Sequence, residues 1–145
     1  MAASAKLYGL ALKSFSNKEI DWDSDTIKVM LCTSSYTPNQ DTHQYKSDIT
    51  AEVTGTGYIA GGATLTGCTA TYNAGTNTLT LDAGDVSWPN STIVARYAVI
   101  YDASPASDAT RPLIGYVDFD QNISTTAGTF SIVWDAAGIV TLTAA

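Results

Sequence analysis

Apolar and polar residues alternate along most of the chain in short runs, which are separated by turns rich in Gly, Pro, Asn and Asp. A period of two is typical of β-strands that have one buried face. The pattern predicts strands over residues 26–33, 49–53, 63–72, 78–83, 86–88, 93–101, 113–119, 129–135 and 139–143. Eight or nine short strands without intervening helices favour a single all-β domain, built as an antiparallel β-sandwich or barrel.

Three of these segments predict more detail. The run 93–101 is the most apolar and is expected to be the central strand. Asn and Gly in 73–77 predict a hairpin between the strands on either side, because both residues adopt positive φ at low cost. In 113–119 the alternation predicts Leu113, Gly115, Val117 and Phe119 on one face, and Ile114, Tyr116 and Asp118 on the other.

The N-terminal segment differs from the rest and predicts a short or frayed helix over residues 5–17. Its apolar residues recur at three- and four-residue steps, at Leu7, Leu10, Ala11 and Phe15. We therefore divide the chain into an N-terminal arm or short helix, 1–25, and a β-sandwich domain, 26–145. The segment is either an arm that docks on a partner, through Leu7, Leu10 and Phe15, or a helix packed across one edge or end of the sheets.

Composition and charge narrow the possible functions. The chain has 145 residues, of which only 14% are charged, while Thr and Ser are abundant. The net charge is −7, and all of it falls in residues 47–145, because residues 1–46 hold five lysines and five acids. An acidic protein lacks the Lys and Arg that nucleic-acid binding needs. No apolar stretch is long enough to predict a membrane span, so we expect neither nucleic-acid nor membrane partners.

Metal and nucleophile motifs are incomplete. A single histidine, His43, lies in the polar loop 34–48, and no Gly-x-Ser-x-Gly elbow accompanies it. Cys32 and Cys68 have no zinc-site spacing and are expected to be free thiols in the core. Alternate acids in 21–25 could surround calcium, but the EF-hand register then fails at its sixth and twelfth positions. We predict no catalytic residue, no metal and no cofactor.

Two weaker patterns stay open. Asp118 and Asp120 form an acid pair at the end of a predicted strand, which is the only arrangement that suggests a hydrolase. The aromatic residues are expected to lie mainly in the core, although a carbohydrate-binding face is conceivable. Tyr36 and Tyr45 stand in the polar loop, where amphipathic aromatic residues favour protein contacts, and we take them as candidate interface residues.

The order of several segments resembles a family of small virion structural proteins encoded by tailed bacteriophages. The resemblance covers roughly residues 20–142, and it rests on residues 25–31, 33–38, 52–65, 86–101, 112–119, 129–134 and 138–142. Members of this family that have a described role look like head decoration, or cement, proteins, and others are described only as virion or tail-associated. The resemblance brings no catalytic residues to this chain.

The resemblance implies a capsid decoration protein that binds the major capsid protein and stabilises the head. A lattice with local three-fold axes suggests a homotrimer, and the place of action would be the virion, assembled in the cytoplasm of a bacterial host. The alternative is a tail-tip or fibre component that binds a host surface glycan through exposed Trp and Tyr side chains. An enzyme is not expected.

Overall fold

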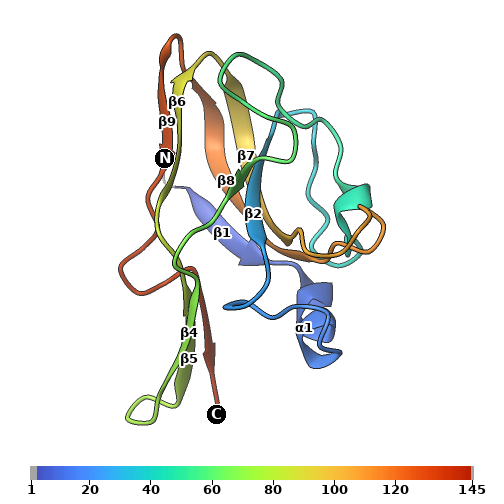
Figure 1. Cartoon of the computed structure of the whole chain (residues 1–145), viewed down its shortest axis with the longest axis vertical. Coiled ribbons are helices and arrows are strands. Elements are labelled where there is room, and N and C mark those ends of the chain that lie inside the picture. Colours follow the sequence, from blue (N-terminus) through green and yellow to red (C-terminus); the bar gives the residue numbers. More distant parts are fainter. Residues whose placement is uncertain (1–2, 145) are drawn as a thin grey trace.

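The chain folds into stacked antiparallel sheets, and the computed structural model describes residues 3–144 (Figure 1). The largest sheet contains, in spatial order, β1 (Ser4–Leu7), β8 (Leu113–Ser124), β7 (Val94–Asp102), β2 (Ile27–Cys32) and β3 (Ala63–Thr64). The smaller sheets are β10 (Val140–Thr143) with β5 (Thr78–Asp82) and β4 (Thr69–Asn73), and the pair β6 (Val86–Ser91) and β9 (Gly128–Ile132). One α-helix, α1 (Gly9–Ser16), and a 3-10 turn, η1 (Lys46–Asp48), complete the described part. The prediction of an all-β, sandwich-like fold is confirmed.

The five-stranded sheet is buried on both faces. Val29 and Leu31 of β2 belong to a core between this sheet and the two smaller ones. Met30 and Cys32 of the same strand belong to a second core, beneath α1 and the loop 33–52. Figure 1 shows the smaller sheets on one side of β2, β7 and β8 and the helix on the other. Strands buried on both faces have nearly continuous apolar sequences, as β2 and β7 have.

Threonine accounts for much of the outer face of the β4–β5–β10 sheet. Thr71, Thr80 and Thr141 form one cross-strand row, since Thr80 pairs with both of the others. In a neighbouring row the hydroxyls of Thr78 and Thr143 are hydrogen-bonded at 3.2 Å. Thr packs well on a pleated surface and stays polar, so this face explains how the chain is rich in strands and poor in charge.

The predicted hairpin and central strand are confirmed. β4 and β5 are adjacent antiparallel strands joined by residues 74–77, where Asn77 has a φ of 52°. β7 lies between β8 and β2 in the middle of the large sheet. Both features follow from local sequence, because the turn needs a residue that tolerates positive φ and the central strand needs apolar residues on both faces.

The prediction of a helix over 5–17 is wrong in its first part. Ser4–Leu7 is a strand that pairs with β8, and α1 begins only at Gly9. Residues 5–7 fit either pattern, because Ala5 and Leu7 alternate with Lys6 while Leu7 also stands one turn before the helix. The edge of β8 decides the outcome by supplying hydrogen-bond partners. The described part of 1–25 therefore packs on the body, with Tyr8, Ile20 and Trp22 buried.

The predicted faces of 113–119 are wrong at their start. Ile100 pairs with Gly115 and Tyr101 pairs with Leu113, so Ile114 is an extra residue in a β-bulge. Leu113 consequently enters the second core and Ile114 the first, the reverse of simple alternation. A bulge shifts the alternation by one residue, and nothing in the local sequence indicates it.

Other boundaries also differ. β8 continues to Ser124, past the predicted end at 119, so Asp118 and Asp120 lie within the strand, and β9 ends at Ile132 instead of 135. The predicted strand 49–53 makes only an isolated bridge between Cys32 and Glu52. The predicted strand 63–72 is two strands, because β3 pairs with β2 and β4 pairs with β5. β6 continues past Pro89, where the register with β9 shifts. Proline is tolerated at such irregularities because no ladder hydrogen bond is needed there.

A buried polar cluster ties the loop 52–62 to β2. The Tyr58 hydroxyl accepts a hydrogen bond from the Leu31 amide at 3.0 Å and donates one to Glu52 Oε1 at 2.8 Å. The same oxygen accepts the Gly61 amide at 2.6 Å, and the Tyr101 hydroxyl donates to the Gly61 carbonyl at 2.6 Å. The Glu52 carboxylate, at the start of the loop, therefore binds Gly61 near the end of the loop as well as Tyr58.

Replacing Tyr58 with phenylalanine is expected to reduce the free energy of unfolding by roughly 2–3 kcal/mol, because the buried Leu31 amide would lose its acceptor. Tyr72→Phe is the matched control, since Tyr72 is exposed and its loss should cost less than about 0.5 kcal/mol. Urea denaturation of both variants measures the difference. Equal effects would show that the Tyr58 hydroxyl has no special role.

Candidate functional site

The acid pair Asp118 and Asp120 is engaged with a cation. Arg96 Nε lies 2.8 Å from Asp118 Oδ1, and Arg96 Nη2 lies 3.3 Å from Oδ2, so the contact is bidentate. The hydrogen bond from Arg96 lowers the pKa of Asp118. Asp120 donates its amide to Asp118 Oδ1 at 2.7 Å and lies 3.9 Å from Arg96. An acid held ionised in this way is poorly suited to donate a proton.

The acids of 21–25 form a turn. Asp25 Oδ2 accepts the Asp21 amide at 2.7 Å, and the Asp25 amide donates to the Asp21 carbonyl at 2.8 Å. Within residues 3–144, no group of three His, Cys, Asp or Glu side chains is arranged to hold a metal ion. Cys32 and Cys68 are both free, the first buried and the second partly buried.

Tyr36 is not a surface residue, contrary to its place among the candidate interface residues. Its side chain is buried, and its hydroxyl lies 2.8 Å from that of Tyr8 and 2.9 Å from His43 Nδ1. The His43 ring stacks on the Tyr36 ring. These hydrogen bonds join the start of α1 to the polar loop. They bury Tyr36, although its polar neighbours in sequence had suggested that it is exposed.

The other candidate interface residues lie in separate places. Tyr45 is half-buried beside β8, where it bridges to Pro112. Leu10 is half-buried on α1, Leu7 ends β1, and Phe15 lies in the last turn of α1. The structure therefore does not gather the five residues into one surface. Leu7 and Phe15 each line a different apolar groove.

The first groove, which we call the hairpin groove, separates the β4–β5–β10 sheet from residues 15–23. It has a volume of about 400 Å³. Leu142, Leu79 and Tyr72 form a cross-strand row on the same face as the row of Val140, Leu81 and Ala70. Leu81 and Val140 are buried in the core, whereas Tyr72 is 60% exposed. The apolar face of this sheet thus continues beyond the core that covers its base.

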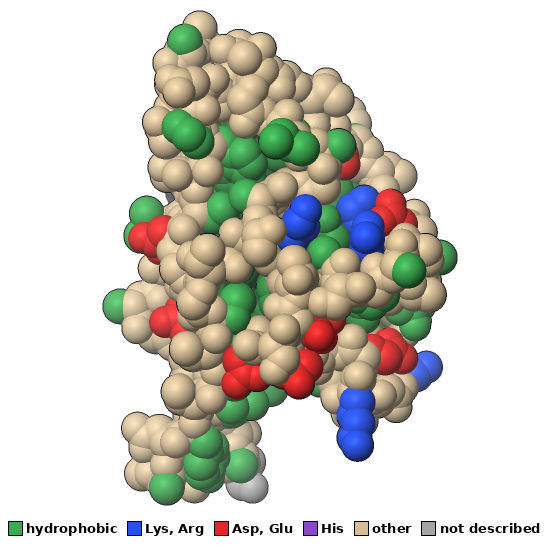
Figure 2. All heavy atoms as spheres, in the orientation of Figure 1, with side chains coloured by type: hydrophobic (Ala, Val, Ile, Leu, Met, Phe, Trp, Pro, Cys, Tyr) green, Lys and Arg blue, Asp and Glu red, His purple; other side chains and the backbone are tan. Residues whose placement is uncertain are grey.

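The hairpin groove lies at one end of the molecule. Figure 1 shows β4 and β5 projecting away from the other sheets, with α1 across a gap. Figure 2 shows apolar side chains gathered on that projecting part. Phe15, Ile20 and Trp22 line the side opposite the sheet, together with Lys18. Asp21 and Asp23 also line it, so the arrangement combines an uncovered apolar strip with charges of both signs.

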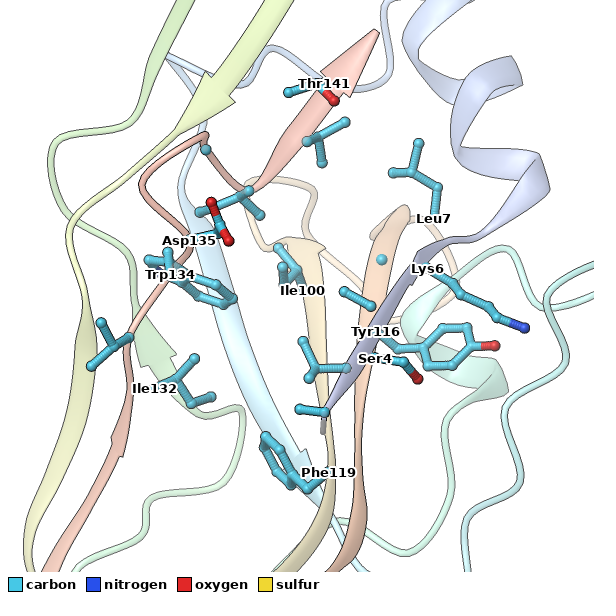
Figure 3. A pocket seen from close by; sticks show the side chains of 18 of the residues that line it. Ser4, Lys6, Leu7, Ile100, Tyr116, Phe119, Ile132, Trp134, Asp135 and Thr141 are labelled. Atoms are coloured by element: carbon cyan, nitrogen blue, oxygen red, sulfur yellow. The ribbon is translucent and has the colours of Figure 1, made fainter. Parts of the chain in front are cut away.

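The second groove, which we call the edge groove, runs along β1 on the open side of the sandwich. Its volume is about 480 Å³. Figure 3 shows Leu7 on one side, Ile132 and Trp134 on the other, and Ile100 and Phe119 between them. Lys6 and Tyr116 point away from the groove, on the far side of β1. Phe119 packs edge-on against Phe130 of β9, but Leu7, Phe119 and Trp134 are only partly buried, so the groove remains partly open.

The tryptophans offer little surface for a flat ligand. Trp22 and Trp88 are 3% and 4% exposed, and the indole nitrogen of Trp22 donates to the Asp82 carbonyl at 3.0 Å. Trp134 is half-buried in the wall of the edge groove, and its indole nitrogen donates to the Gly84 carbonyl. Two of the three tryptophans considered for glycan binding are therefore part of the core.

Comparisons with family models, with curated proteins and with solved structures find no match. In the described part of the chain, no helix has the length and apolar character to cross a membrane.

The grooves themselves were not predicted. Sequence placed Phe119 and Trp134 in strands and therefore in the core, and it gave no reason to separate Leu79 and Leu142 from other buried leucines. An apolar strand face has the same pattern whether or not another layer covers it. Strand length gave no signal either, because the predicted strands 113–119 and 129–135 are equally long, whereas β8 has twelve residues and β9 has five.

Proposed function

We propose that this chain is a bacteriophage virion structural protein that decorates the head by binding the major capsid protein lattice. The observation that carries the proposal is the projecting β4–β5–β10 sheet, whose apolar face extends past the core as the row of Tyr72, Leu79 and Leu142. Interfaces bury an apolar centre inside a polar rim, and this strip has Thr and Asn around it. The sequence resemblance to decoration proteins supports the same role.

Charged side chains flank the apolar strip at this end. Lys13 and Lys18 lie at the C-terminal side of α1, and Lys18 lines the hairpin groove. The remainder of the chain beyond residue 46 carries the whole net charge of −7. Asp21 and Asp23 line the same groove, so charges of both signs flank the apolar strip and favour one orientation on a partner that carries the complementary pattern. Phe15, an interface residue expected from sequence, belongs to this groove.

The experiment mixes the full chain with purified expanded heads that lack decoration and measures co-sedimentation. We expect saturable binding of the wild-type chain, and at least a tenfold loss for Tyr72→Asp, which places a charge in the apolar strip. Thr71→Asp is the matched control, since Thr71 is the neighbouring exposed residue on the opposite face of β4, and its binding should be unchanged.

Absence of co-sedimentation, or equal loss with both variants, would reject the head-binding proposal. Mass spectrometry of intact virions gives the copy number separately. Hundreds of copies are expected for a component of the head shell, whereas a few copies would place the chain in the tail. The homotrimer suggested by lattice symmetry stays a prediction, and the oligomeric state of the purified chain, measured by sedimentation equilibrium, separates it from a two-fold dimer.

A further inference from the structure

β1 leaves one backbone edge open. The Tyr8 amide donates to the Ile114 carbonyl at 3.1 Å, on the side of β1 that faces β8. Backbone groups alternate in direction along a strand, so those of Ala5 and Leu7 point away from β8. Gln40 Nε2 donates to the Leu7 carbonyl at 2.9 Å and closes the C-terminal end of this edge. In the described chain, β1 is the last strand of its sheet.

The open edge lies directly beside the edge groove. Ala5 pairs with Val117 and Leu7 pairs with Gly115, which places both on the face that packs against the first core. Val117, Phe119 and Trp134 are only partly buried. A strand added to β1 would therefore gain backbone hydrogen bonds and cover apolar side chains in the same step.

We propose that a second copy of this chain pairs antiparallel with β1 across a two-fold axis, with Ala5 opposite the partner's Ala5. In this register Ala3 lies opposite the partner's Leu7, and Ser4 opposite the partner's Lys6. The outward amide and carbonyl of Ala5 are then both used. The Leu7 amide meets the partner's Ala3 carbonyl, which requires the exposed Gln40 side chain to leave the Leu7 carbonyl. The contact is self-complementary, as a two-fold interface must be.

Repulsion between lysines disfavours the alternative register in which the two strands are shifted by two residues. Pairing Ala5 with the partner's Leu7 would set Lys6 directly opposite the partner's Lys6, and like charges that face each other destabilise a sheet. In the proposed register Lys6 faces the partner's Ser4. Ser4 is next to Asp118 in its own sheet, so the lysine approaches an acid across a small side chain. Lys6 forms no salt bridge in residues 3–144.

The pairing does not require attachment to a head, and it is tested with the purified chain alone. Sedimentation equilibrium is expected to give a dimer, with twice the 15.2 kDa mass of one chain. Ala5→Pro removes the outward amide, which β1 does not use to pair with β8, and should weaken dimerisation by at least about tenfold. Ala5→Val keeps the amide and serves as the control. Thermal unfolding of both variants verifies that the fold is intact.

Cysteine cross-linking tests the register in a Cys68→Ser background. Ala5→Cys is expected to give a disulfide-linked dimer on mild oxidation, because residues opposite each other in adjacent strands lie within disulfide range. Lys6→Cys should not link to itself. A monomer, a trimer, or cross-linking of Lys6→Cys without that of Ala5→Cys would overturn the proposal. Because no heads are present, these outcomes are independent of head binding.

Discussion

Replacing Gly62 with alanine is expected to lower the free energy of unfolding by roughly 3–5 kcal/mol. Gly62 has a φ of 82°, which L side chains rarely adopt. A Cβ at this position would overlap the Val29 carbonyl and lie 2.7 Å from the Met30 Cα. Those atoms belong to β2, which is paired on both sides by β7 and β3, so the strand cannot move away cheaply. Urea denaturation measures the loss.

Gly67→Ala is the matched control for this variant. Gly67 also has a positive φ, 63°, but an added Cβ would meet no atom within 4 Å. It should therefore show the conformational cost alone, about 1 kcal/mol. If the two variants were equally destabilised, the close approach of the loop 52–62 to β2 would not be what requires glycine at position 62.

The stability of the wild-type chain is expected to fall as the pH rises from about 4 to about 8, because of Asp102. Its side chain is fully buried at the end of β7, and only Oδ1 accepts a hydrogen bond, from the Ser104 amide at 2.8 Å. Asp102 Oδ2 is buried and has no hydrogen-bond partner among the described atoms. Burial, and then the neighbouring Asp25 carboxyl, raise the pKa of Asp102 to about 7.

The sign follows from where the proton is held. The folded chain keeps the Asp102 proton up to about pH 7, while the unfolded chain releases it near pH 4. Folding therefore binds a proton between these values, and the stabilisation present at low pH is lost as the pH rises through the folded pKa. The loss is expected to reach roughly 4 kcal/mol by pH 8. Chemical denaturation at several pH values measures it.

Asp102→Asn should remove most of this slope, because an amide side chain does not titrate. The variant is expected to be more stable than the wild-type chain at pH 8. Asp23→Asn is the control, since Asp23 is an exposed acid of the neighbouring turn and its replacement should leave the slope unchanged. Equal slopes in the wild-type chain and Asp102→Asn would contradict the assignment. Asp118, whose pKa is lowered by Arg96, has its effect only at lower pH.

Sequence predicted best those elements whose patterns are local and repeated. β2 and β7 were recognised because several consecutive positions agree, and the β4–β5 hairpin because Asn77 can adopt the backbone conformation of its turn. Residues 5–7 fit two patterns equally, and only the presence of β8 makes them a strand. Ile114 shows the same limit, since the bulge there depends on pairing with β7.

For the candidate site, sequence gave separate pieces. Phe15 was predicted to contact a partner and does line the hairpin groove. Tyr36 was predicted as a contact residue of the polar loop 34–48 but is buried, because Tyr8 and His43 supply its hydrogen bonds. Polar neighbours in sequence do not determine whether a side chain is buried when its hydrogen-bond partners come from elsewhere in the chain.

The alternating pattern and the scarcity of charge determined, by themselves, that this chain is an all-β protein with a threonine-rich surface. Both depend on residue type alone. Tertiary structure decided which apolar faces remain uncovered: a groove stays open along β1, at the edge of the large sheet, and the β4–β5–β10 sheet extends beyond its core. Coverage depends on how many strands each layer has and where each strand ends, and these are set by pairing between segments that are far apart in the sequence.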